Sequence, residues 1–250
     1  MTDDLFKITT QRLTALRAEM TRHGLDAYLV PVKDAFFNEE IPDRWKRFRF
    51  LTGFDPSLGF AVITKDKAAL IFEGIYFDQA TDYVKKNGLS DLFQVQHIGE
   101  YNNGLDEKSA DWLKDVLPAS CVVGYDASLH AGDAARAMRH ILQTKNITLK
   151  PVESNLVDVV WEQEGKALDG HGASPIYHLP ERFTGESVQA RIAKTLGVFA
   201  TQAQPADALL LGAPSSLCWL LNLRGSDATF SPLPFLRGWL DAQGQVTLFA

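Results

Sequence analysis

The sequence predicts an α/β fold in which two consecutive domains each contain a mixed β-sheet flanked by helices. Apolar residues make up 46% of the 250 and charged residues 22%, which is the composition of a globular chain. Stretches with helical periodicity alternate with short apolar runs of strand length. The helix, strand and hairpin that open the chain recur in the same order near its end.

The first part of the chain predicts a helix, a strand and a hairpin, followed by further helix and strand units. Leu13, Leu16 and Met20 recur at three- and four-residue spacing, which is typical of an amphipathic helix. The expected helices span residues 9–23, 77–86, 108–117, 132–143 and 156–161, the last capped by Asn155. The expected strands span residues 27–30, 60–64, 68–72, 93–98, 122–125 and 147–152. Together they predict a mixed sheet with helices covering it.

The composition changes after residue 161, where Gly and Pro recur without sustained periodicity. We therefore expect a first domain of residues 1–164, a linker of residues 165–185 and a second domain of residues 186–250. The second domain predicts helix 186–202, strand 207–211, apolar segment 219–223 and the hairpin 235–240/245–249. This copy stops inside its second hairpin strand, so we expect the second domain to be incomplete.

Charge and cysteine content narrow the class of protein. The 25 basic and 31 acidic residues give a net charge of −6, which disfavours nucleic acid and anionic membrane surfaces as partners. Cys121 and Cys218 each precede apolar residues, as small buried side chains do in a reducing compartment. No apolar run approaches the roughly 18 residues of a membrane span. We expect a cytoplasmic protein with no membrane association.

Motifs that carry chemistry are missing from the sequence. The six histidines lack the spacing that places two imidazoles on one metal, and we expect them at the surface or in loops: His23, His97, His130, His140, His171 and His178. There is no glycine-rich dinucleotide or phosphate loop and no Gly-x-Ser-x-Gly elbow. We expect no catalytic residue, no metal ligand and no cofactor in this chain.

The segment from Arg44 to Phe54 is unusual because it holds four cations and four aromatic residues. Interleaved basic and aromatic side chains can bind single-stranded nucleic acid. The alternative is a helix that turns Trp45, Phe48 and Leu51 inward while its cations are solvated or pair with nearby acids, namely Glu39, Glu40 and Asp43. The negative net charge favours the helix.

A second unusual segment runs from Trp219 to Asp227, where an apolar run ends in Asn, Arg, Gly, Ser and Asp. One interpretation is a turn in which Asp227 pairs with Arg224. The other is the rim of a site, where Arg224 meets a carboxylate of a substrate or of another domain. The residues by themselves favour the turn.

Three segments carry a resemblance to a known family: residues 39–59, residues 155–161 and the Leu-Leu-Asn-Leu-Arg-Gly-Ser-Asp run of residues 220–227. Their order and spacing resemble the N-terminal part of the three-domain Xaa-Pro aminopeptidases, the aminopeptidase P group of the creatinase superfamily (peptidase family M24). The resemblance implies two consecutive creatinase-N-type domains ahead of a catalytic domain that holds two divalent metal ions, usually manganese. No position here matches the metal ligands of that family, so the catalytic metal-binding domain is expected to be absent.

The resemblance also implies a function for the parent protein. It would remove the N-terminal residue from short peptides with proline second, and this chain would contribute substrate gating and a homodimer surface. Four residues in the matching segments are candidates for substrate access or interdomain contact: Arg47, Phe50, Arg224 and Asp227. The chain departs from the family pattern at Ile75, where an arginine is usual, and at Leu58, where a small residue is usual.

Two other functions remain open at this point. Relatives that have lost the metal ligands would act as non-catalytic modules that bind peptides or proteins. A creatinase-type amidinohydrolase is the other alternative, although it would normally carry one such N-terminal domain rather than two.

Overall fold

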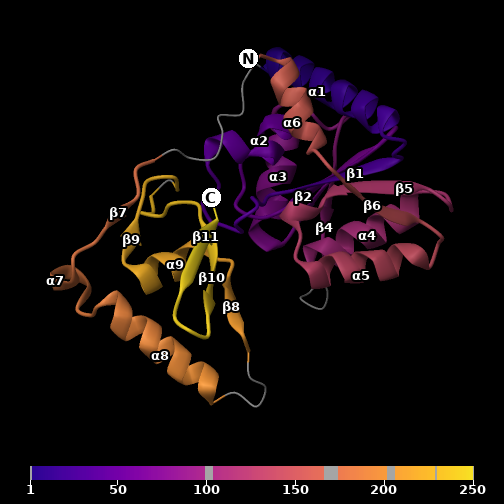
Figure 1. Ribbon diagram of the computed structural model, residues 1–250. Coiled ribbons are helices and arrows are strands. Elements are labelled where there is room, and N and C mark those ends of the chain that lie inside the picture. The colour runs from indigo at the N-terminus through magenta and orange to yellow at the C-terminus, as the bar shows by residue number, and fades with distance from the viewer. Residues whose placement is uncertain (1, 99–103, 166–173, 202–205, 229, 250) are drawn as a thin grey trace. The chain divides into compact units, whose positions relative to one another are not determined.

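The computed structural model describes residues 2–98, 104–165, 174–201, 206–228 and 230–249 (Figure 1). The contacts divide the chain into two compact units. Unit 1 comprises Met1–Ala35 with Asp43–Leu168, and unit 2 comprises Phe36–Pro42 with Asp169–Ala250. Phe36 belongs to unit 2 because its ring stacks on that of Phe235, with the centroids 5.1 Å apart.

Unit 1 alternates helices and strands. Its helices are α1 (Thr2–Arg22), α2 (Arg47–Thr52), α3 (Gly74–Lys86), α4 (Leu105–Val116), α5 (Gly132–Gln143) and α6 (Leu156–Gln163). Two short 3-10 helices precede α2 and α5, namely η1 (Asp43–Trp45) and η2 (Ala127–Leu129). Its strands are β1 (Ala27–Pro31), β2 (Phe60–Thr64), β3 (Ala68–Phe72), β4 (Gln94–His97), β5 (Val122–Asp126) and β6 (Thr148–Val152). The helices and strands predicted for this part of the chain are confirmed.

The start of α1 differs from the prediction, since the helix begins at Thr2 rather than at residue 9. The reason is Thr9, which is buried although it is polar. It occupies a core position between Leu5 and Leu13, so it interrupts the apolar periodicity without interrupting the helix. The predicted cap of α6 is confirmed, because the Asn155 side chain accepts a hydrogen bond from the Val157 N–H.

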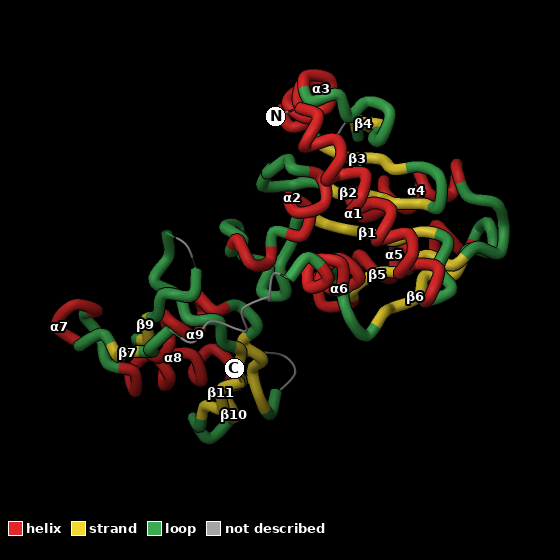
Figure 2. The backbone as a smooth tube through the Cα atoms, turned by 90° about the horizontal axis from the view of Figure 1, so that it is seen from above, coloured by secondary structure: helices red, strands yellow, loops and turns green. Residues whose placement is uncertain are grey.

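Six strands of unit 1 form one mixed sheet in the order β4-β3-β2-β1-β5-β6. Strands β1, β2 and β3 pair antiparallel, while β5 lies parallel to both β1 and β6, and β4 lies parallel to β3. Helices α4 and α5 cover one face of the sheet, and α1, α2 and α6 cover the other (Figures 1 and 2). All residues of β2 and β3 are buried. Burying each such valine, leucine or isoleucine side chain contributes about 1.5–3 kcal/mol.

Unit 2 is smaller. Its helices are α7 (Glu181–Thr184), α8 (Val188–Ala200) and α9 (Pro214–Leu221). Its strands are β7 (Tyr177–His178), β8 (Ala208–Leu211), β9 (Leu223–Arg224), β10 (Arg237–Asp241) and β11 (Val246–Phe249). Strands β8, β10 and β11 form an antiparallel sheet with β10 in the middle, and β7 pairs antiparallel with β9. Elements β7 and α7 fall within the segment that the sequence assigns to a linker.

Unit 2 repeats the opening of unit 1, as the sequence order suggests. The elements α8, β8, α9, β10 and β11 follow the order of α1, β1, α2, β2 and β3. The registers also correspond, because Ala27 pairs with Thr64 at the start of β1, and Ala208 pairs with Asp241 at the start of β8. The fold class predicted from the sequence, a mixed α/β fold with two related units, is confirmed.

The segment with many cations and aromatic residues folds as the favoured alternative predicts. It forms η1 and α2, and Trp45, Phe48 and Leu51 are buried. Arg49 pairs with Asp43 at 3.3 Å as predicted, whereas Lys46 donates to Asp55 at 2.8 Å, an acid that the prediction did not include. Among the described residues, every helix is too short or too polar to cross a lipid bilayer.

Candidate functional site

Arg47, one of the four candidates, joins α2 to α6. Its Nε donates to Asp158 Oδ1 at 2.7 Å and its Nη2 donates to Asp158 Oδ2 at 2.8 Å. The two side chains are only 11% and 20% exposed. A bidentate pair of this kind is both strong and directional, because the planar guanidinium matches the carboxylate.

Phe50, the second candidate, lies one turn further along α2 and is buried. Its ring stacks on Trp161 of α6, with the centroids 4.5 Å apart and the planes 7° from parallel. Arg12 of α1 covers the ring at 3.8 Å from its centroid and donates through Nη1 to the Phe50 carbonyl at 2.5 Å. Arg12 also pairs with Glu164 just after α6 at 2.7 Å. Phe50 therefore joins α1, α2 and α6.

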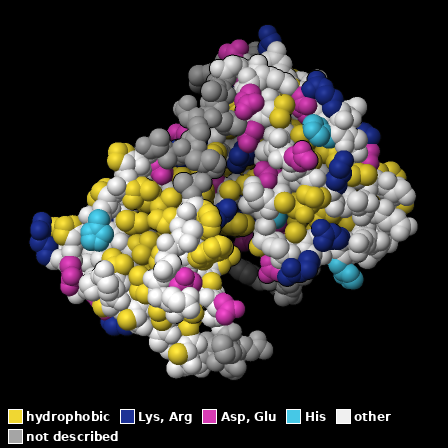
Figure 3. All heavy atoms as spheres, in the orientation of Figure 1, with side chains coloured by type: hydrophobic (Ala, Val, Ile, Leu, Met, Phe, Trp, Pro, Cys, Tyr) yellow, Lys and Arg dark blue, Asp and Glu magenta, His cyan; other side chains and the backbone are white. Residues whose placement is uncertain are grey.

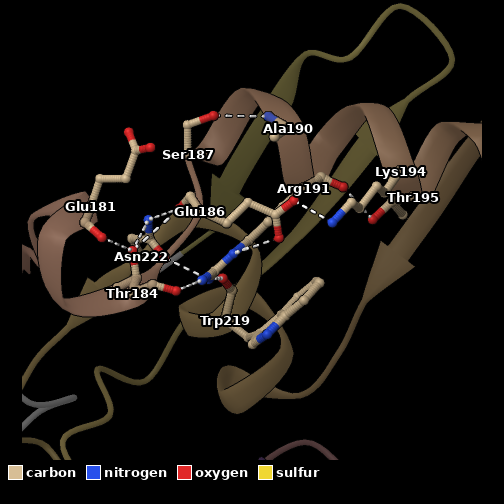
Figure 4. A network of polar contacts seen from close by, with 10 residues as sticks. All are labelled: Glu181, Thr184, Glu186, Ser187, Ala190, Arg191, Lys194, Thr195, Trp219 and Asn222. Carbon is tan, nitrogen blue, oxygen red and sulfur yellow. Dashed lines mark hydrogen bonds and ion pairs between the residues drawn. The ribbon is translucent and has the colours of Figure 1, made fainter.

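In unit 2, Arg191 on α8 joins helices as Arg12 does in unit 1 (Figure 4). It donates through Nη1 to the Trp219 carbonyl and to Asn222 Oδ1, the latter at 2.5 Å, and through Nη2 to the Thr184 carbonyl at 3.0 Å. Its guanidinium lies 5.0 Å from the centroid of the Trp219 ring. Glu186 approaches its Nε at 3.8 Å. These contacts tie α7, α8 and α9 together.

Asn222 completes this network at the end of α9. It adopts a left-handed conformation with φ of 53°, which asparagine tolerates better than most residues. Its backbone N–H donates to the Cys218 carbonyl, closing the helix. Its side-chain amide donates to Thr184 Oγ1 at 3.2 Å and to the Glu186 carbonyl at 3.3 Å. The side chain is buried, so each of these bonds replaces contact with water.

Arg224 and Asp227 do not form the ion pair that the turn interpretation predicts. Arg224 instead donates through Nη1 to the carbonyls of Leu223 at 2.7 Å and Cys218 at 3.2 Å. Asp227 accepts backbone N–H groups, from Phe235 at 2.9 Å and from Ser174 at 3.3 Å. Both side chains therefore form their hydrogen bonds with backbone groups rather than with each other. Asp227 in this way links two loop segments of unit 2.

Gly225 lies between these two residues at a point of close backbone approach. A Cβ atom there would lie 2.8 Å from Pro234 Cβ and 2.9 Å from Pro234 N. Only glycine fits this position without a shift of the neighbouring backbone. The path of the loop beside Arg224 is set by this contact.

A buried polar cluster in unit 1 was not anticipated from the sequence. His130 Nδ1 donates to Asp106 Oδ1 at 2.7 Å, and Lys33 Nζ donates to Asp106 Oδ2 at 2.9 Å. Burial would raise the pKa of Asp106, but the hydrogen bond from His130 and the charge of Lys33 hold that pKa below its usual range. The cluster ties the end of β1 to the starts of α4 and α5.

His130 is one of the histidines expected at the surface or in a loop. His130 follows η2 in a loop, as expected, but its side chain is fully buried. Its second ring nitrogen, Nε2, has no hydrogen-bond partner among the described residues. Four other histidines are exposed as predicted: His23, His97, His140 and His178. His171 lies outside the described residues.

The roles of Arg191 and Arg12 were also not predicted from the sequence, although the position of Arg191 within its helix is a signal that could have indicated one. It falls on the apolar side of α8, one position before Ile192 and three after Val188, where a cation is unusual.

Cys121 and Cys218 are both buried and free, in agreement with their apolar sequence context. In the part of the chain that the structure describes, no three His, Cys, Asp or Glu side chains gather as metal ligands would. A dinuclear metal centre therefore has no fitting place among these residues.

Known proteins share the sequence pattern of this chain. A family model described as the creatinase/prolidase N-terminal domain matches residues 12–160, and a second model with the same description matches residues 170–250. The Xaa-Pro aminopeptidase 2 of Homo sapiens is 34% identical over 97% of this chain. The probable Xaa-Pro aminopeptidase P of Coprinopsis cinerea is 32% identical over 91% of it. The chain spans about a third of the length of both relatives (34% of each).

The fold itself has a solved counterpart. The crystal structure of X-prolyl aminopeptidase from Caenorhabditis elegans, described as a cytosolic enzyme with a di-nuclear active site, matches with a TM-score of 0.81. The match covers 96% of this chain and 38% of that one, at 25% sequence identity. The resemblance to the Xaa-Pro aminopeptidases inferred from the sequence is thereby confirmed.

Proposed function

Because the chain belongs to the creatinase/prolidase N-terminal domain family, we propose that it is the non-catalytic N-terminal portion of a metal-dependent Xaa-Pro aminopeptidase. The parent protein removes the N-terminal residue from short peptides that have proline second. This portion contributes substrate gating and a homodimer surface, while the catalytic centre resides in a part of the parent that this chain does not contain.

One observation carries the proposal. Xaa-Pro aminopeptidases from a fungus and a mammal are similar to this chain over more than nine-tenths of its length. The chain spans only about a third of the length of either enzyme. The described residues provide no cluster that could hold a metal ion. A division of labour within a longer enzyme accounts for both facts.

The substrate class explains why such an enzyme needs a restricted entrance. An Xaa-Pro bond is a tertiary amide without an N–H, and the ring of proline fixes its φ angle. A site shaped for that bond gains selectivity when neighbouring domains admit only short chains that can present it. Two divalent metal ions in the parent, which we propose to be manganese, would polarise the scissile carbonyl and supply the attacking hydroxide.

The four candidate residues receive different parts in this proposal. Arg224 ends β9, and the loop that follows it has its path fixed by Gly225 and Asp227. We assign it contact with a carboxylate of the substrate or of the catalytic domain. Arg47 and Phe50 are occupied by α6 within unit 1, so their influence on substrate access is exerted through the position of that helix.

A direct test compares the full-length parent with the chain of residues 1–250, both supplied with manganese. A tripeptide with proline second is the substrate, and the same tripeptide with alanine second is the control. We expect the parent to hydrolyse the proline peptide and residues 1–250 to leave it intact. Hydrolysis by residues 1–250, or a parent that binds the peptide without cleaving it, would overturn the proposal, and the second result would instead indicate a peptide-binding module.

Sedimentation of the parent tests the proposed dimer surface, and fractionation of the source cells tests the proposed cytoplasmic location. A monomeric parent would remove dimerisation from the proposal. Recovery of the parent with membranes or outside the cell would remove the cytoplasmic location.

A further inference from the structure

Unit 2 contains a groove of about 400 Å³ between α8, β8 and α9. Its lining combines apolar side chains with hydroxyl groups; among the lining residues are Thr195, Leu209, Leu211, Ser216, Trp219 and Leu220. The surface of unit 2 shows gathered hydrophobic side chains (Figure 3). Trp219 stands out at this groove because its side chain is 55% exposed.

The internal repeat identifies counterparts in unit 1 for the groove residues on α9. Helices α2 and α9 both end at a left-handed residue, Gly53 and Asn222. Counting back from these two residues pairs Phe48 with Leu217, Leu51 with Leu220, Phe50 with Trp219 and Arg47 with Ser216. The first two pairs agree closely, since all four side chains are buried.

Phe50 and Trp219 also each contact an arginine in the equivalent position of its unit. Arg12 and Arg191 each come from the helix before the first strand, lie over the aromatic ring and donate through Nη1 to the carbonyl of the aromatic residue. The two aromatic residues therefore hold equivalent positions. Their exposure nevertheless differs greatly, at 5% for Phe50 and 55% for Trp219.

Helix α6 accounts for this difference. It packs against α1 and α2 in unit 1 and buries Leu156, Val157 and Val160. Its Trp161 stacks on Phe50. The groove in unit 2 occupies the place that corresponds to α6, and the exposed Trp219 ring corresponds to the surface on which Trp161 lies.

We propose that the groove is the docking site of an amphipathic helix of the α6 kind, whose aromatic side chain stacks on Trp219. The helix is supplied by the polypeptide that follows β11, because α6 follows the strands of unit 1 in the same order. The relatives are about three times as long as this chain, which leaves room for such a helix. The fit of a helix to the groove rests on the internal repeat alone, while the source of that helix rests on the proposed function, in which this chain is part of a longer protein.

The groove also indicates which charged and polar side chains this helix should carry. In unit 1 the docked helix carries Asp158 opposite Arg47, and Glu164 follows it to pair with Arg12. In unit 2 the position of Arg47 is taken by the neutral Ser216, and the acid nearest Arg191 is Glu186, which precedes α8. The docking helix therefore needs no acidic residue at either position, and a small polar residue fits opposite Ser216.

The first test uses residues 1–250 and a synthetic peptide as the probe. The peptide has the sequence of residues 153–165 with Asp158→Ser, and it carries a lactam staple because short isolated helices are marginal in water. In ¹H–¹⁵N spectra of labelled protein we expect saturable shifts of the Trp219 indole N–H and of the Thr195 and Ser216 amides. A stapled peptide with Trp161→Ala is expected to bind at least about tenfold more weakly, because it lacks the stacking ring.

Matched protein variants define the location of binding. Ser216→Trp fills the groove and is expected to abolish the shifts, while Gln189→Trp adds the same side chain to an exposed position of α8 and is expected to leave them. Each variant is checked for an unchanged spectrum elsewhere. No saturable shift at millimolar peptide, equal binding to Ser216→Trp, or shifts confined to α1 and α2 would overturn the proposal.

The second test identifies the source of the helix. Ser216→Cys is reacted with a maleimide in residues 1–250 and in the full-length parent, with Gln189→Cys as the control. We expect Ser216→Cys to react about tenfold or more slowly in the parent, because a docked helix must open before the reagent enters. Equal rates in the two proteins would show that the polypeptide after β11 does not fill the groove.

Discussion

Arg47 and Asp158 lie 111 positions apart in the sequence, yet they form a bidentate ion pair that fixes α2 against α6. Both side chains are largely buried. Removing one partner leaves the other charge without compensation in a poorly hydrated place, which is the costly way to break such a pair. The pair therefore matters most for keeping α6 in position over Phe50.

We expect Asp158→Asn to lower the free energy of unfolding by about 2–4 kcal/mol, since the residual exposure reduces the full penalty of a buried pair. Chemical denaturation of residues 1–250 measures it. Asp55→Asn is the control, because its pair with the partly exposed Lys46 should be worth about 1 kcal/mol or less. Equal losses for the two variants would contradict the role given to Arg47.

The cluster of Lys33, Asp106 and His130 predicts a dependence of stability on pH. Because the pKa of Asp106 is lower in the folded state, its contribution is fully present above the ordinary carboxyl pKa of about 4 and is lost as the pH falls through the folded value. We expect Asp106→Asn to cost about 2–3 kcal/mol at neutral pH. The difference from the wild type should shrink below about pH 4. A difference that stays constant from pH 7 to about pH 3 would refute the linkage.

Two glycines in unit 2 give opposite predictions for the same substitution. Gly225→Ala places a Cβ against Pro234 and is expected to destabilise the protein by about 1–3 kcal/mol. Gly197→Ala lies in α8 with nothing near the added atom, so it is expected to stabilise the protein by about 0.5–1 kcal/mol. Thermal unfolding compares the two. A neutral Gly225→Ala would show that the loop is free to move away from Pro234.

Arg224→Ala tests the assignment of Arg224 in the full-length parent. If Arg224 holds a carboxylate of the substrate or of the catalytic domain, kcat/KM should fall about tenfold or more, which corresponds to about 1.4 kcal/mol, with little change in Tm. Arg182→Ala serves as the control, because Arg182 is exposed on α7. Kinetics within about twofold of the wild type would leave Arg224 with its two backbone carbonyls and a structural role only.

The sequence predicts most of the fold because its secondary structure rests on local patterns. Apolar periodicity locates the helices, apolar runs locate the strands, and the side chain of Asn155 locates the start of α6. Thr9 shows the limit of this reasoning. A polar residue in a core position conceals the first turns of α1, because periodicity counts only apolar side chains.

The polar contacts could not be predicted in the same way. The carboxylate partner of Arg47 comes from a distant helix, and the partners of Arg191 include backbone carbonyls, which every residue carries. Proximity in the sequence even misleads, since Arg224 and Asp227 are three positions apart but each bonds to the backbone. Whether two such groups meet depends on tertiary packing, which short-range spacing does not record.

The attachment of α8 has a consequence for the way unit 2 opens. Within this fully described helix, Arg191 is the only side chain that is buried, and polar bonds hold it. Ile192 and Leu196 of α8 are only partly buried against the core of unit 2, so detaching α8 should have a smaller denaturant m-value and heat-capacity change than opening the fully buried strands of unit 1. Amide exchange in α8 should accordingly respond weakly to low urea, in the manner of local fluctuation, while exchange in β2 and β3 rises steeply with it. Urea and temperature would then rank the two units by the kind of surface they release.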